Sequence, residues 1–331
     1  MTTEQAFAPF IRALGRGKKS ARSLTREEAR TAFQAVLNGD ASPVQIGAFL
    51  MLLRMKEETA EELAGFVEAV RHTIAPVPTI ATDLDWSSYA GKRKHAPWFV
   101  LSALLLANNG IRVFMHGTAG HTAGRLYTED AFATLGLPMA RDWQAVQHAL
   151  DHTRLCFMPL SCWCPALQDL IDLRAQFGLR SPVHTLVRLV NPTSAPCSLQ
   201  SIFHPAYAEN HSHAAWLLQQ PQALVIKGDG GEFEYRPDAD TKLFLVQHGE
   251  RSQQHWARHF PQPCAAEDTL NITDLARVWR GEITHPYAEA AIIGTVALVL
   301  RALARADQQT DADALAQAWW QQRNTAWTFP T

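Results

Sequence analysis

The sequence predicts an α/β protein with a small helical N-terminal domain and a larger α/β domain, in which helices flank a central, mainly parallel sheet. Two observations predict this class. The first 75 residues carry only helical patterns, and beyond residue 79 short β-like runs alternate with helical runs. Such alternation is typical of a layered α/β domain. With 331 residues the chain can form one large domain or two smaller ones.

Boundary signals define the helices of the N-terminal part. Thr25 followed by Glu28, and Thr59 followed by Glu62, have the spacing of a capping box, which marks the start of a helix. Pro43 suits the first turn of a helix between these two. A proline-containing linker at residues 75–78 then separates this part from the rest of the chain.

Beyond the linker the two kinds of pattern alternate. The β-like runs are residues 111–115, 156–158, 223–226 and 243–246. The helical runs are residues 98–108, 166–177, 205–219, 287–304 and 312–323.

Composition excludes several classes of protein. The chain is 47% hydrophobic and 19% charged, which is typical of a soluble globular protein. The longest apolar runs, residues 98–107 and 290–300, are too short to span a bilayer. Basic residues interrupt any signal-peptide pattern at the start, so we expect a cytoplasmic protein without membrane contact. The five cysteines are expected as free thiols, because the C-x-C pair at Cys162 and Cys164 lacks zinc-site spacing.

The net charge of −2 conceals three segments without a single carboxylate. Residues 11–26, 87–127 and 173–208 contain no Asp or Glu but hold 14 of the 30 lysines and arginines. If the fold brings them together, they form a strongly positive surface on a nearly neutral protein. The alternative is that acid-free segments arise by chance in apolar sequence.

Two cationic loops are candidates for phosphate contact. Arg16, Lys18, Lys19 and Arg22 follow one another in a glycine-containing loop, which suits a flexible hook on a phosphate backbone or an ordinary solvated loop. Lys92, Arg93 and Lys94 form the second loop, expected as a surface that phosphates reach.

Further candidates lie in the other acid-free segments or at a strand end. Arg125 ends a glycine-rich stretch, Arg174 and Arg180 flank a helix end, and Lys227 ends a strand. His116 follows a strand and is either a ligand or a satisfied core histidine. Trp86, Tyr89 and Trp98 lie between the cations, a pattern seen where single-stranded bases stack on aromatic rings. Aromatic residues at this spacing more often belong to the core, and stacking is considered chiefly for Tyr89.

Five segments carry a family pattern in a constant order. They are G-A-F-L-M-L-L-R-M-K-E-E-T-A-E-E-L (47–63), V-F-M-H-G-T (113–118), F-M-P-L…C-P-A-L (157–167), L-R-A-Q-F-G-L-R-S…L-V-N-P (173–192) and V-I-K-G-D-G-G-E-F-E (225–234). They resemble the anthranilate phosphoribosyltransferases. The resemblance implies the class III phosphoribosyltransferase fold, also seen in pyrimidine nucleoside phosphorylases. It implies a helical dimerisation domain at residues 1–76, joined by helices from about 163–190, and an α/β domain at 79–331. In that family the position of Arg174 meets the anthranilate carboxylate.

The catalytic motifs depart from the family's pattern. In place of a G-T-G-G-D-type loop and an N-I-S-T turn, the chain has S-S-Y-A-G at 87–91 and P-W-F-V at 97–100. The family's K-H-G-N becomes M-H-G-T at 115–118, and its Asp-Glu magnesium pair appears as Phe233-Glu234. A single carboxylate holds Mg²⁺ poorly, and transfer depends on metal and donors neutralising the pyrophosphate. We therefore expect no catalytic residues, no cofactor and no metal, beyond a weak Mg²⁺ site at Asp229, Glu232 and Glu234.

Two further motifs, G-R-G-K-x-x-A-R-x-L at 15–24 and S-Y-x-G-x-R-K at 88–94, resemble a narrower branch, the YbiB-type proteins. This resemblance implies a homodimer that binds DNA or RNA without sequence preference, with a role in the DNA damage response. The leading hypothesis is thus a nucleic-acid-binding protein on a catalytically degenerate scaffold. The alternative is a phosphoribosyl- or glycosyl-transferring enzyme with a different acceptor and a weakened Mg-pyrophosphate site. A third is an assembly protein with a vestigial cleft.

Overall fold

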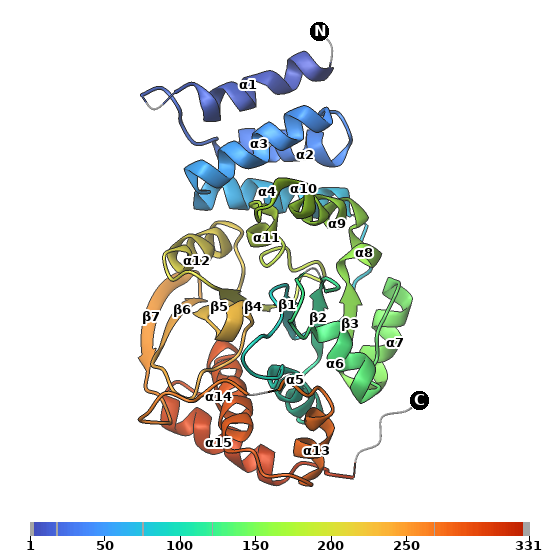
Figure 1. Ribbon diagram of the computed structural model, residues 1–331, viewed down its shortest axis with the longest axis vertical. Helices are drawn as coiled ribbons and strands as arrows, with labels where there is room; N and C mark the ends of the chain where they lie inside the picture. The colour runs from blue at the N-terminus through green and yellow to red at the C-terminus, as the bar shows by residue number, and fades with distance from the viewer. Residues whose placement is uncertain (1–2, 18, 75, 121, 268, 327–331) are drawn as a thin grey trace.

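A helical layer lies at one end of the molecule and a sheet flanked by helices at the other (Figure 1). This is a computed structural model, which describes residues 3–17, 19–74, 76–120, 122–267 and 269–326. The predicted fold class is confirmed.

Four helices form the first part of the helical layer: α1 (Thr3–Gly15), α2 (Arg26–Leu37), α3 (Pro43–Lys56) and α4 (Ala60–Thr73). Both predicted capping boxes are present. Thr25 Oγ1 accepts from the Glu28 backbone N–H, and the Glu28 carboxylate accepts from the Thr25 N–H. Thr59 and Glu62 repeat this exchange at the start of α4. These bonds satisfy backbone donors that a helix N-terminus otherwise leaves without partners.

Four short helices from the middle of the chain lie against this layer (Figure 1). They are α8 (Leu160–Trp163), α9 (Pro165–Asp172), α10 (Arg174–Phe177) and α11 (Val183–Leu186). The buried side chains of α8, α9 and α11 share one hydrophobic core with α1–α4, and the partly buried Phe177 of α10 packs against it. The single helix predicted at residues 166–177 is divided at Leu173 into α9 and α10.

The sheet has seven strands in the order β3-β2-β1-β4-β5-β6-β7. Neighbouring strands from β3 to β5 pair in parallel, and β6 and β7 pair antiparallel. The strands are β1 (Leu84–Ser88), β2 (Val113–Gly117), β3 (Leu155–Pro159), β4 (Cys197–Ile202), β5 (Gln222–Lys227), β6 (Thr241–Gln247) and β7 (Glu250–Trp256). β1, β4 and β7 were not predicted, because polar residues interrupt their apolar pattern.

Side chains alternate along each strand, so apolar side chains point to both faces of the sheet, and helices cover both faces. On one face Met115, Phe157 and Leu224 pack in a core with α5 (Phe99–Asn108), α6 (Thr128–Leu135), α13 (Asp274–Arg280), α14 (Pro286–Ala302) and α15 (Gln309–Gln321). On the other face the alternate residues meet α7 (Trp143–Thr153) and α12 (Tyr207–Leu217). None of the helices in the described part of the chain is long and apolar enough to cross a membrane.

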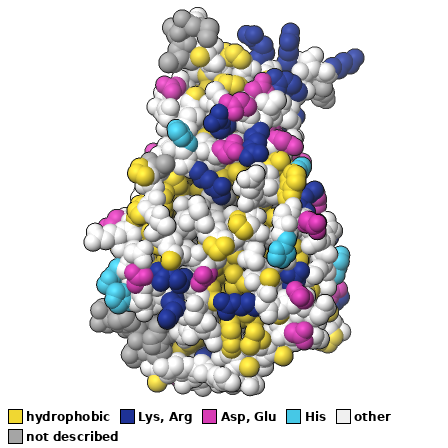
Figure 2. All heavy atoms as spheres, turned by 180° about the vertical axis from the view of Figure 1, so that it is seen from behind, with side chains coloured by type: hydrophobic (Ala, Val, Ile, Leu, Met, Phe, Trp, Pro, Cys, Tyr) yellow, Lys and Arg dark blue, Asp and Glu magenta, His cyan; other side chains and the backbone are white. Residues whose placement is uncertain are grey.

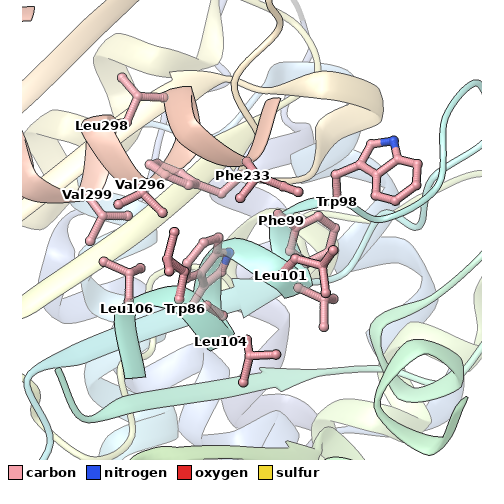
Figure 3. Close-up of a cluster of buried hydrophobic side chains, with 14 of the residues drawn as sticks. Trp86, Trp98, Phe99, Leu101, Leu104, Leu106, Phe233, Val296, Leu298 and Val299 are labelled. Atoms are coloured by element: carbon pink, nitrogen blue, oxygen red, sulfur yellow. The ribbon is translucent and has the colours of Figure 1, made fainter. Parts of the chain in front are cut away.

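Trp86 and Trp98 are core residues, each 1% exposed or less. Figure 3 shows Trp86 between the sheet, α5 and α14. Its ring lies 6.1 Å from that of Phe99 and 5.6 Å from that of Phe233, measured between centroids. The core interpretation is therefore confirmed for both tryptophans. All five cysteines are free thiols, as predicted.

Gly65→Ala is expected to lower the free energy of unfolding by about 1–3 kcal/mol, as overpacking of a core does. A Cβ at Gly65 would lie 2.3 Å from the backbone oxygen of Arg26, so α2 and α4 could not approach as they do. Urea unfolding followed by circular dichroism measures the loss.

The matched control is Gly47→Ala in α3, where a Cβ would meet only Phe177 Cε1 at 3.7 Å. That variant is expected to gain up to about 1 kcal/mol from the higher helix propensity of alanine. Equal stability of the Gly65→Ala variant and the unaltered protein would contradict the close packing of α2 on α4.

Candidate phosphate-binding cleft

The candidate site lies at the carboxyl ends of the parallel strands, where ligands bind in open α/β sheets. The loops that follow β1, β2 and β5 hold one another here. Arg125 Nη1 donates to the carbonyl oxygens of Ala90 and Gly91, at 2.9 Å each. Glu232 Oε1 accepts from the backbone N–H groups of the same two residues, at 2.6 Å each. The backbone of the β1 loop is thus held from both sides.

Lys92 lies at the centre of this arrangement and is fully buried. Its Nζ donates to the carboxylates of Asp229 and Glu234, which come from the loop after β5. The second oxygen of Glu234 accepts from the backbone N–H of Phe99, the first residue of α5, at 2.8 Å. We call these three side chains, Lys92, Asp229 and Glu234, the buried ion cluster.

The charges in the buried ion cluster explain how its members titrate. Burial works against the charged form of Lys92, but Glu234 and Asp229 outweigh it and raise the pKa of Lys92 above its ordinary value. Burial would also raise the pKa of Asp229, but the Lys92 ammonium lowers it. Burial raises the pKa of Glu234 to about 7, although Lys92 opposes the shift. Burial is the largest cause of the shift at Glu234, and the neighbouring Asp229 carboxylate adds to it.

These carboxylates do not fit a magnesium ion. Mg²⁺ requires oxygen ligands that are free to coordinate it, whereas Asp229 and Glu234 already neutralise an ammonium group. Glu232 accepts two backbone hydrogen bonds at Oε1, and its buried Oε2 has no hydrogen-bond partner among the described residues. No cluster of three metal-ligating side chains occurs among the described residues. The positive charge between Asp229 and Glu234 is the ammonium group of Lys92.

The structure corrects the expected position of Lys92. The sequence predicts Lys92, Arg93 and Lys94 together on a surface, but only Arg93 and Lys94 are exposed. These two line a cavity of about 380 Å³ together with Arg125, Lys227 and Arg236, and we call this cavity the cleft. Asp229 and Asp238 also line it, and Arg236 is paired with Asp238 at 3.2 Å. Lys92 cannot reach a ligand without breaking the buried ion cluster.

Four arginines converge beside the cleft. Burial lowers the pKa of Arg180, and the charges of Arg188, Arg125 and Arg174 lower it further. Such mutual repulsion shows that positive charge accumulates here. Arg188 was not among the predicted site residues, although it belongs to the acid-free segment 173–208. Its place in that acid-free segment, beside Arg174 and Arg180, was the available signal.

Tyr89 and His116 are buried, 1% and 0% exposed, and cannot contact a ligand in this structure. Tyr89 Oη is hydrogen-bonded to His116 Nδ1 at 2.7 Å, and His116 Nε2 lies 3.2 Å from Asp85 Oδ1. Burial, with a contribution from Asp85, raises the pKa of Tyr89 well above its ordinary value. The stacking hypothesis for Tyr89 is wrong for this structure, because the ring has no exposed face.

The first cationic loop lies apart from the cleft. It follows α1 at the outer end of the helical layer (Figure 1), where Figure 2 shows lysine and arginine side chains projecting at the upper right. Arg16 and Lys19 are exposed, whereas Lys18 lies outside the described residues. The Arg22 guanidinium binds the Glu28 carboxylate through two hydrogen bonds of 2.6 Å. Two of the three acid-free segments therefore meet at the cleft, and the first does not.

Comparison with known proteins identifies the class. Residues 8–74 match the model of the helical bundle domain of a glycosyl transferase family, and residues 99–322 match the a/b domain of that family. The chain belongs to this glycosyl transferase family.

Individual relatives narrow the comparison. The chain is 34% identical over 247 residues to the uncharacterized protein YbiB of Escherichia coli, covering 72% of this chain and 76% of that protein. It is 27% identical over 324 residues to the anthranilate phosphoribosyltransferase of Methylobacterium nodulans, covering 95% and 94%. The solved anthranilate phosphoribosyltransferase of Thermus thermophilus superposes with a TM-score of 0.75 at 21% identity, covering 97% and 94%. The Saccharomyces cerevisiae enzyme in complex with PRPP and Mg gives 0.77 at 14% identity, covering 96% and 94%.

Lys92→Met is expected to lower the free energy of unfolding by about 3–5 kcal/mol at pH 8, because it leaves two buried carboxylates without their cation. The loss is expected to shrink towards pH 5. A carboxyl group whose pKa is raised in the folded state binds more protons there than in the unfolded chain, so stability falls as pH rises. Lys92 lowers the pKa of Glu234, so its removal raises that pKa further and makes the fall in stability with pH steeper. Urea unfolding at several pH values measures it.

Lys94→Met is the control, since this exposed neighbour is expected to change the free energy of unfolding by no more than about 0.5 kcal/mol. If the two variants were equally stable at pH 8, the buried ion cluster would not have the role described.

Proposed function

We propose that this protein binds nucleic acid without sequence preference, through the phosphate backbone, at a cleft that has lost the family's metal chemistry. One observation carries the proposal. The carboxylates available for a metal hold Lys92, while Arg93, Lys94, Arg125 and Lys227 line the open cavity beside them.

The first half of this observation argues against magnesium-dependent transfer. A phosphoribosyl transfer with pyrophosphate as leaving group depends on positive charge that neutralises the departing oxygens. Asp229 and Glu234 are occupied by Lys92, and one oxygen of Glu232 by backbone N–H groups, so no group of three side chains that could hold that ion is found among the described residues.

The second half supports a polyanionic ligand. Arg93, Lys94 and Lys227 are exposed, so a phosphate backbone can reach them without any rearrangement of the core. Association with nucleic acid through lysine and arginine releases counterions, and this sequence-independent contribution dominates non-specific binding. Arg174 and Arg180 extend the positive field of the cleft towards α10 and α11.

A second candidate is a phosphoribosyl- or glycosyl-transferring enzyme with a different acceptor. The comparisons support it more directly than nucleic-acid binding, because the family and the solved structures with the same fold are glycosyl- and phosphoribosyltransferases. Calorimetry with phosphoribosyl pyrophosphate, with and without Mg²⁺, separates the two candidates. Saturable binding that requires Mg²⁺, followed by pyrophosphate release with an acceptor, would favour the enzyme.

The proposal also includes pairing of two copies of the chain through the helical domain. It further includes a cytoplasmic location and a role in the DNA damage response. Val44 and Met55 on α3 are each 82% exposed. They lie about three turns apart and thus on one face of the helix. Contiguous apolar surface marks protein interaction sites, and these two side chains would contribute to such a surface on α3 if two copies pair there.

The salt dependence of binding tests the main proposal. The double variant Arg93→Ala/Lys94→Ala is expected to weaken binding to all sequences alike. It should reduce the slope of log K against log salt concentration by about 0.7–0.9 for each phosphate that the variant no longer neutralises. Fluorescence anisotropy with single- and double-stranded DNA and RNA oligonucleotides measures both effects.

Arg141→Ala/Arg305→Ala is the control for net charge, since both arginines are exposed and neither lines the cleft. The proposal fails if the unaltered protein shows no salt-sensitive binding at low salt, or if both double variants behave alike.

Met55→Glu is expected to convert a dimer of this chain to monomers, because it places a charge in the proposed apolar contact. Sedimentation equilibrium measures the change. Met139→Glu is the control, at a methionine that is 44% exposed outside α3. A monomeric unaltered protein would contradict the pairing.

A further inference from the structure

A second cavity, of about 130 Å³, lies where the helical layer meets the sheet. Its walls come from α3, from residues 180–188, from the end of β4 and from the start of α12. Phe203 lines both this cavity and the cleft. We call the new cavity the junction pocket.

Three basic side chains of one short segment reach the junction pocket. They are Arg180, His184 and Arg188, from α11 and the residues on either side of it. His184 lies in α11 and Arg188 in the turn after it, while Arg180 precedes the helix; all three line the pocket. Arg54 reaches it from the last turn of α3.

Arg188 is built into the wall of the junction pocket and is only 7% exposed. Its Nη1 donates to the carbonyl oxygens of Ser201 at 2.5 Å and Gly231 at 2.7 Å, and its Nε donates to that of His184 at 3.2 Å. These acceptors are neutral. Burial lowers the pKa of Arg188, and Glu232 and Tyr89 offset this only in part.

Ser181 supplies a second polar group in the wall of the junction pocket. Its side chain lines the pocket and is 3% exposed, and its Oγ has no hydrogen-bond partner among the described residues. A buried hydroxyl without a partner is unfavourable, so such groups are normally satisfied by protein, water or ligand.

Negative charge is nearly excluded from the junction pocket. None of its lining residues within the described chain is Asp or Glu. Carboxylates that do not line the pocket still lie near its residues: Glu57 accepts from Tyr207 Oη at 3.5 Å, burial raises the pKa of Glu58 to about 7, and the charge of Glu232 acts on Arg188. His211 adds no charge at neutral pH, because burial and Arg188 lower its pKa to about 3.

We propose that the junction pocket binds a phosphate group, which Arg180 and Arg188 hold through their guanidinium groups and Ser181 through its hydroxyl. A guanidinium presents paired N–H donors that match the oxygens of a phosphate. The pocket is smaller than the roughly 300–1,000 Å³ of sites that enclose drug-sized ligands, so it takes the phosphate group rather than a whole nucleotide. This site does not depend on the function proposed for the cleft.

The phosphate group has two possible sources. One is a small phosphorylated molecule that enters the junction pocket alone. The other is the backbone of a strand that already lies in the cleft and passes Phe203, which is 54% exposed between the two cavities. Both sources present the same chemistry to the arginines.

Titration with inorganic phosphate tests the site on the full chain. Isothermal calorimetry at constant ionic strength, with chloride as the balancing anion, is expected to show saturable binding. Arg180→Met should weaken it at least tenfold and Ser181→Ala about two- to tenfold. Arg188 is left unchanged, because its hydrogen bonds to Ser201 and Gly231 also hold the fold. Arg305→Met, at an exposed arginine outside the pocket lining, should bind as the unaltered protein does.

The proposal is overturned if phosphate binds no better than chloride, or if Arg180→Met and Ser181→Ala both bind phosphate like the unaltered protein. A competition arm separates the sources. If phosphate weakens oligonucleotide binding more than chloride does, and Arg180→Met removes this difference, the backbone supplies the group. If oligonucleotide binding is unaffected or absent while phosphate still binds, a small phosphorylated molecule supplies it, and only the nucleic-acid proposal for the cleft fails.

Discussion

The buried ion cluster of Lys92, Asp229 and Glu234 is the interaction on which the rest of the site depends. It ties the loop after β1 to the loop after β5, and through the Phe99 N–H it also holds the start of α5. α5 has no side-chain cap of its own, so a carboxylate from a distant part of the chain serves that purpose. Charges taken out of water in this way are stable only as a set.

The same cluster links structure to function. A yeast enzyme with the same fold, an anthranilate phosphoribosyltransferase, has been solved in complex with PRPP and Mg. Here a lysine supplies the positive charge between the carboxylates, and the exposed cations beside it are Arg93, Lys94 and Lys227. The cleft therefore combines a buried ion cluster with an exposed basic margin.

Much of the fold could be predicted because its signals are local. Capping boxes at Thr25 and Thr59 depend on residues three positions apart, and they are present as predicted. β1 was not predicted, because three of the five residues in its sequence, L-D-W-S-S, are polar although the strand is fully buried. Asp85 is accommodated there only by residues distant in the chain, Ser198 and His116. The hydrophobic pattern of a short sequence segment cannot show that distant residues will pair with a buried aspartate.

By itself the sequence determined the α/β class, the helix caps and the three acid-free segments. Only the tertiary structure decided which cations face a ligand. Lys92, Arg93 and Lys94 are adjacent and chemically alike, yet Lys92 is buried because Asp229 and Glu234, 137 and 142 residues away, fold against it. Arg22 is likewise neutralised by Glu28, while Arg180 and Arg188 approach each other. Burial and charge pairing are properties of neighbours in space, and no spacing along the chain specifies them.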